Sequence, residues 1–169
     1  MSTESTNASV GRIVTRDIDE FQQFAAPWDV ILRQMSPGVF HGRTEYLQVN
    51  GILLYREHCS HRIMATGSTP AGFFLFGGPA SSRTRVSWCG AELNARCLAF
   101  GRPSSGVDFV IPAGSDHLVL YQRARSLRRR LQADVRRIPV DDAQTLRPVA
   151  PETAGRYAAR IDEPLSADC

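Results

Sequence analysis

The dipeptide Asn50-Gly51 constrains the fold of this chain more than any other feature of its sequence. It separates two runs rich in β-branched, aromatic and aliphatic residues, at 39–49 and 52–58. Asn-Gly favours positive φ at both central positions of a two-residue turn, which is the geometry that joins antiparallel strands into a hairpin. A second turn, Ser36-Pro37-Gly38, predicts that a strand over 28–35 joins the same sheet. We therefore expect a three-stranded meander over 28–58.

The rest of the first 122 residues continues this pattern of short strands and turns. A short helix over 18–26, capped by Asp17, is predicted before the meander. More strands are predicted after it, at 61–66, 73–76, 83–89, 97–100, 107–111 and 117–122. About nine short strands at spacings of roughly 8–12 residues indicate a sandwich or a barrel.

After residue 122 the apolar pattern changes to a helical period. In 123–137 apolar residues recur every three or four positions, which predicts a helix with a narrow apolar stripe. Seven arginines occupy its other faces, and a polar linker follows at 139–150. Three roles are open for the helix: a solvated face, non-specific contact with nucleic-acid phosphates, or dimerisation. Dimerisation would bury the residues of the stripe, Leu127, Leu131 and Val135.

Composition and charge are those of an ordinary soluble chain. No apolar run approaches the ~20 residues that a membrane span needs. Residues 1–9 are polar and lack the features of a secretory signal, so we expect a disordered tail and a cytoplasmic protein. None of the four cysteines forms a C-x-x-C pair, which favours reduced thiols. The net charge of +3 belongs entirely to 123–169, because arginines and acids balance in 1–122.

The most specific local pattern is Gly106-x5-Pro112-x-Gly114-x2-His117. It resembles the second sequence motif of the cupin superfamily, whose histidine is a ligand in the metal-binding members. The first cupin motif, which supplies H-x-H and a glutamate, has no match here. Because a catalytic metal needs about three protein ligands, we expect no metal and no other cofactor. His117 is then either an ordinary interior residue or a contact for an organic ligand.

The aromatic residues are better placed to bind a molecule than to react with one. The chain has no G-x-S-x-G, no Walker loop, no G-x-G-x-x-G and no H-E-x-x-H. In a small barrel, alternate side chains point inward and either fill the interior or line one cavity. Leu53, Tyr55 and Glu57 share one face of their strand, and an inward Glu57 would be a poor core residue but a good ligand anchor. The residues expected to bind a ligand are Phe40, Arg43, Tyr55, Glu57, Phe74, Trp88 and His117.

An ordered series of short motifs covers about two-thirds of the chain. It consists of Trp28, Gln34-Met35-Ser36-Pro37-Gly38-Val39-Phe40-x-Gly42, Tyr55-Arg56-Glu57, Gly67-x-x-Pro70, Trp88-Cys89-Gly90 and Gly101-Arg102-Pro103-x-x-Gly106-x-Asp108. This series resembles the N-terminal sensing domain of AraC-type bacterial transcription regulators. The resemblance implies a cupin-like barrel that binds an effector, then helices that dimerise, then a linker to a DNA-binding domain. That last domain, of two helix-turn-helix units, is not found in this chain.

We therefore expect a mainly β protein, with a cupin-like (jelly-roll) barrel over 10–122 and a helical dimerisation region and linker over 123–169. The expected function is that of an effector-sensing and dimerisation domain rather than an enzyme. Its expected partners are a small organic molecule and a second copy of itself, with DNA contacted only through the missing domain and no membrane contact. Two alternatives stay open: a small metal-dependent cupin enzyme that uses His117, and a non-catalytic interaction module with a filled barrel.

Overall fold

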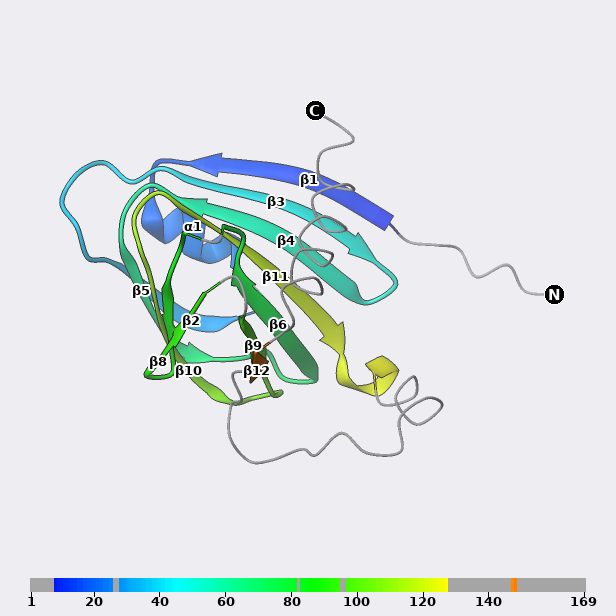
Figure 1. The fold of residues 1–169 in the computed structure, drawn as a ribbon. Helices are drawn as coiled ribbons and strands as arrows, with labels where there is room; N and C mark the ends of the chain where they lie inside the picture. The colour runs from blue at the N-terminus through cyan, green and yellow to red at the C-terminus, as the bar shows by residue number, and fades with distance from the viewer. Residues whose placement is uncertain (1–7, 26–27, 82, 95–96, 128–146, 149–169) are drawn as a thin grey trace.

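The computed structural model describes residues 8–25, 28–81, 83–94, 97–127 and 147–148, which form two antiparallel sheets packed face to face (Figure 1). One sheet has the strand order β1-β3-β4-β11-β6-β9-β12, and the other has the order β2-β5-β10-β7-β8. The strands are β1 (Ala8–Thr15), β2 (Asp29–Gln34), β3 (Gly42–Val49), β4 (Ile52–Cys59), β5 (Ile63–Ser68), β6 (Phe73–Pro79), β7 (Val86–Trp88), β8 (Ala91–Leu93), β9 (Cys97–Gly101), β10 (Gly106–Ile111), β11 (Ser115–Arg123) and β12 (Arg147–Pro148).

The hairpin at Asn50-Gly51 is confirmed. β3 and β4 pair antiparallel with Val49 opposite Ile52, and the two turn residues have φ of 47° and 78°. Positive φ at both positions makes a tight turn whose twist matches that of the flanking strands. β11 then pairs with the other edge of β4.

The predicted three-stranded meander is wrong in one strand. β2 pairs with β5 in the five-stranded sheet, whereas β3 lies between β1 and β4 in the seven-stranded sheet. The connection over 35–41 crosses between the sheets, and the Gln34 side chain donates to the carbonyls of Ser36 and Gly38 within it. Ser36-Pro37-Gly38 therefore belongs to a crossing loop and not to a hairpin.

The fold is mainly β, as expected, but the described strands form an open sandwich and not a closed barrel. In this part of the chain, β1 and β12 end one sheet, while β2 and β8 end the other. β1 was not predicted, and it places residues 8 and 9 in a strand rather than in the expected tail. Residues 1–7 lie outside the described residues.

The expected helical region at 123–169 is described only in part. Residues 124–127 form a helical turn directly after β11, and β12 pairs with β9 inside what was expected to be linker. Leu131 and Val135, two members of the predicted dimerisation stripe, lie outside the described residues.

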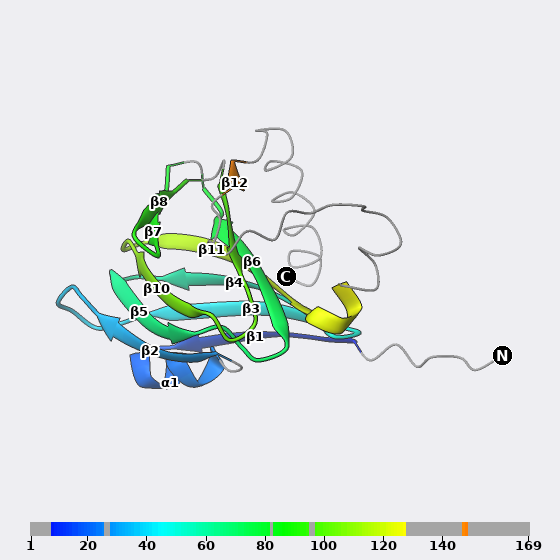
Figure 2. The ribbon, with the colours of Figure 1, turned by 90° about the horizontal axis from the view of Figure 1, so that it is seen from below.

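The core lies between the two sheets, and helix α1 (Ile18–Phe24) packs beside β2 at one end of it (Figure 2). The Asp17 carboxylate accepts hydrogen bonds from the backbone N–H groups of Asp19 and Glu20, which confirms the predicted cap. Phe21 points into the core, where its ring meets Phe40 edge to face at 5.3 Å between centroids.

Candidate functional site

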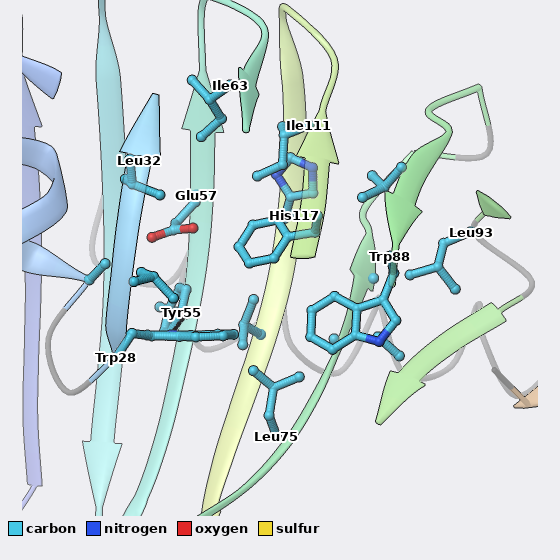
Figure 3. Close-up of a pocket in the computed structure, with 18 of the residues that line it drawn as sticks. Trp28, Leu32, Tyr55, Glu57, Ile63, Leu75, Trp88, Leu93, Ile111 and His117 are labelled. Carbon is cyan, nitrogen blue, oxygen red and sulfur yellow. Dashed lines mark hydrogen bonds between the residues drawn. The ribbon is translucent and has the colours of Figure 1, made fainter. Parts of the chain in front are cut away.

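A cavity of about 60 Å³ lies between the two sheets (Figure 3). Its walls come from α1 and from strands of both sheets, and they are mostly aliphatic and aromatic. One water needs roughly 10–15 Å³ of such space, so the cavity has room for about four waters or an organic molecule of similar size. The interior is therefore not completely filled by side chains.

Strand alternation on β4 and β11 places the polar groups of this cavity. Tyr55 and Glu57 of β4 line it together with His117 and Val119 of β11, while the residues between them face the other side of the sheet. In the β4–β11 register Glu57 lies directly opposite His117. Side chains at opposite positions of an antiparallel pair are near neighbours. Figure 3 shows both of them pointing between the sheets.

Glu57 is the acidic side chain among the described lining residues. No described residue pairs with its carboxyl group, and burial alone raises the pKa of Glu57 to about 7. Burial has this effect because removal from water disfavours the ionised form of an acid. The cavity therefore contains a carboxyl group that changes charge near neutral pH.

His117 is the basic side chain among the same residues. The ring is 5% exposed, and neither of its nitrogens makes a hydrogen bond of ordinary geometry with the described residues, although the backbone of Glu57 is close enough to act against the lowering of the His117 pKa. Burial lowers the pKa of His117 to about 4, although the negative charge of Asp116 acts against this shift. The imidazole is therefore neutral at pH 7, and its acceptor nitrogen is available to a bound molecule.

Aromatic rings cover a large part of the remaining wall. Trp28 Nε1 donates to Tyr55 Oη at 2.8 Å, and Tyr55 Oη lies 3.1 Å from Tyr121 Oη. Burial raises the pKa of both tyrosines, so both hydroxyls stay protonated at neutral pH. Trp88 stacks on Phe109 at 5.6 Å between centroids, and its indole N–H has no partner among the described residues.

The structure brings together four of the seven residues predicted to bind a ligand: Tyr55, Glu57, Trp88 and His117 all line the cavity. The other three, Phe40, Arg43 and Phe74, are not among its described lining residues. Phe40 lies in the core against Phe21, and Phe74 stacks on Phe100. Arg43 is on the outer face of β3, within 4 Å of Glu45 and Asp116 (3.7 and 3.9 Å).

The seven residues expected to bind a ligand did not include Trp28 and Phe109, which also line the cavity. Trp28 directly precedes β2 and was noted only as part of the motif series. Phe109 lies two positions before Ile111 in β10, and both line the cavity. Strand alternation was a usable signal for Phe109, since its neighbours Asp108 and Val110 belong to the opposite face.

The described residues contain no group of three His, Cys, Asp or Glu side chains that could hold a metal ion. Glu57 and His117 supply two such groups at most, so the described site falls short of the roughly three protein ligands of a catalytic metal. The expectation that the protein has no metal cofactor stays a prediction. None of the helices in the described part of the chain is long and apolar enough to cross a membrane.

No family model matches the chain, and no curated protein matches its sequence. Among solved structures, the chain is similar to the crystal structure of the AraC-like transcriptional activator CuxR, with a TM-score of 0.61 and 13% sequence identity. The similarity covers 94% of this chain and 63% of the activator, so it spans less than two-thirds of that protein. At this identity the comparison shows a shared fold.

Proposed function

We propose that this chain is the effector-sensing part of an AraC-like transcription regulator, and that the cavity between the sheets is the effector site. The proposal depends mainly on one observation: in a fold shared with such an activator, a cavity contains two polar groups, Glu57 and His117, that have no side-chain hydrogen-bond partner among the described residues. Buried polar groups normally have hydrogen-bond partners, so groups without one are candidates for contact with a ligand. DNA binding would belong to a domain outside this chain.

The first experiment asks whether small molecules bind in the cavity. We expect a thermal-shift screen of small metabolites to find compounds that raise the melting temperature, because a ligand specific for the native state stabilises it by mass action. Ala99 lines the cavity, and Ala99→Ile adds three carbon atoms there, so this variant should lose the response. Leu98→Ile is the matched control, since Leu98 is the preceding residue of β9 and belongs to the opposite face.

Two results would contradict a ligand site in the cavity. One is a screen without any hit, and the other is a set of hits that stabilise Ala99→Ile as much as wild type. If Ala99→Ile alone fails to fold, Val119→Phe at another lining position repeats the test.

The second experiment asks whether binding has a regulatory consequence. The chain is fused to a DNA-binding domain that represses a reporter only as a dimer, and a hit from the screen is added. We expect reporter output to change with wild type and with Leu98→Ile, but not with Ala99→Ile. Unchanged output with a ligand that binds the purified chain would contradict the regulatory role and leave the binding site intact.

A further inference from the structure

The charge distribution around Glu57 favours a ligand that brings its own positive charge. Glu57 has no described partner, and the neighbouring arginines of β3 and β4, Arg43 and Arg56, point to the outer face of the sheet. There they lie 3.9 and 3.6 Å from the carboxylate of Asp116. An anion in the cavity would meet the Glu57 carboxylate with no described cation beside it, which is costly in an apolar site. A cation would instead supply the missing partner.

The aromatic wall of the cavity also favours a positively charged ligand. Trp28, Phe109 and Trp88 follow one another along the wall, with centroid distances of 5.8 Å and 5.6 Å between successive rings. The indole N–H of Trp28 already donates to Tyr55, so Trp28 can meet a ligand through its ring face. Trp88 and Phe109 stack on each other, which leaves one face of each ring for contact with a ligand. Aromatic faces carry partial negative charge and attract an ammonium group within about 6 Å.

The two hydrogen-bond acceptors favour a cation with at least two N–H donors, and a primary ammonium group is the smallest such group. Glu57 and His117 are opposite each other on β4 and β11, and both point between the sheets (Figure 3). An ionised carboxyl group accepts through two oxygens, and a neutral imidazole accepts through one nitrogen. A primary ammonium group has three N–H donors and can donate to both residues at once. A quaternary ammonium group has none and would leave both unpaired.

We propose that the cavity binds a small primary ammonium compound, with Glu57 as its ionic anchor, His117 as a second acceptor and the Trp28–Phe109–Trp88 wall around its apolar part. The role of this compound as an effector rests on the proposed function. Its binding to the cavity can be tested without that function. The cavity volume of about 60 Å³ limits the ligand to a molecule roughly as large as four waters. Propylamine has this size and serves as the probe.

The test compares three probes of similar size and different charge: propylamine, which is protonated at pH 8, neutral 1-propanol, and anionic propionate. Binding to the full chain is measured by NMR titration. We expect propylamine to bind at least about tenfold more tightly than 1-propanol, and propionate to bind more weakly than either. The affinity for propylamine should fall about tenfold from pH 8 to pH 6, because Glu57 takes up a proton while His117, Tyr55 and Tyr121 stay uncharged.

Substitutions test whether Glu57 causes the preference for propylamine. Glu57→Gln should weaken propylamine binding about tenfold or more and weaken 1-propanol binding much less, because only the amine loses an ionic partner. Glu45→Gln is the matched control, since Glu45 lies on β3 outside the cavity and within 4 Å of Arg12 and Arg43 (3.9 and 3.7 Å). Equal affinity for propylamine and 1-propanol, or wild-type affinity in Glu57→Gln, would overturn the proposal. If Glu57→Gln does not fold, the comparison of the three probes on wild type decides the question.

The outcomes separate this proposal from the proposed function. A neutral or anionic metabolite whose binding is blocked by Ala99→Ile would overturn the amine assignment and leave the sensor function standing. A cavity that binds no compound of any charge would overturn both. Propylamine binding without any effect on the reporter would support the ligand class and contradict the regulatory role.

Discussion

At the scale of single residues, Glu57 and His117 have opposite pKa shifts with the same cause. Burial disfavours the charged form of each, so the pKa of Glu57 rises from 4.5 to about 7 and that of His117 falls from 6.5 to about 4. The folded protein binds the Glu57 proton more tightly than the unfolded chain, so this group's stabilising effect is present below pH 4.5 and lost as pH rises to 7. The stabilising effect of neutral His117 is present above pH 6.5 and lost as pH falls to 4.

The shift of Glu57 predicts a stabilising substitution. Glu57→Gln removes a carboxyl group that is costly to ionise in the cavity, so at pH 8 its free energy of unfolding should exceed that of wild type by about 3 kcal/mol. The gain should shrink as pH falls below 7 and vanish below pH 4.5, where Glu57 of wild type is protonated in both the folded and the unfolded state. Urea unfolding of both proteins across this pH range measures the difference. A constant difference at all pH values would show that Glu57 titrates normally.

At the scale of elements, Gly67 determines how closely β2 approaches β5. A Cβ atom at this position would lie 2.0 Å from the carbonyl oxygen of Asp29 and 2.6 Å from Cα of Val30. Both are backbone atoms of the paired strand, so they cannot turn away as a side chain can. β5 lies between β2 and β10, and displacement of β2 would also affect Val30 and Leu32, which line the cavity.

Gly67→Ala should therefore destabilise the protein by about 2–4 kcal/mol and weaken any ligand that binds in the cavity. Gly72→Ala is the matched control, because Gly72 also has positive φ (79°) but no atom within 4 Å of the added Cβ. That substitution should cost only the backbone strain, about 1 kcal/mol. Thermal and urea unfolding measure both losses. Equal losses of stability in the two variants would mean that β2 moves away from the Cβ added at Gly67 at little cost.

The elements that were predicted correctly are those whose signal is local. Asn50-Gly51 specifies its own turn, and Asp17 caps its own helix, whichever strands surround them. The partner of β2 was predicted wrongly because pairing depends on distant residues of β5. β1 was missed because much of it faces solvent, with Val10 and Val14 51% and 63% exposed, so its apolar pattern is weak.

The same difference between local and long-range signals explains which residues of the candidate site were predicted correctly. Tyr55 and Glu57 were predicted together because alternation along one strand requires them to share a face. Phe74 belongs to an unbroken apolar run, 73–76, in which the sequence does not show which side chains point inward. In the structure Leu75, and not Phe74, lines the cavity. The pairing of Glu57 with His117 depends on the β4–β11 register, which joins strands far apart in the sequence.

At the scale of the whole molecule, β11 links the cavity to the helical turn at 124–127 that follows it. His117 lies in the cavity, and the helical turn at 124–127 begins directly after the last residue of the same strand (Figure 1). The backbone N–H of Arg123 donates to the carbonyl of Gly51, and that of Ala124 donates to the carbonyl of Gly72. These bonds fix the start of the helical turn to the β3–β4 hairpin and to the turn before β6. A ligand that contacts His117 therefore contacts the strand from which this turn continues.

Dimerisation through Leu127, Leu131 and Val135 stays a prediction, and it is tested at this scale. An isolated helix as short as the one predicted over 123–137 is marginal without packing, so the predicted apolar stripe would need a partner surface. We expect wild type to sediment as a dimer at micromolar concentrations, and Leu127→Asp with Leu131→Asp to give a monomer that still melts cooperatively. Ser126→Asp adds a charge next to the stripe and should leave the dimer intact. A monomeric wild type would contradict the prediction. A double variant that fails to fold would show that the stripe packs on the sandwich of the same chain.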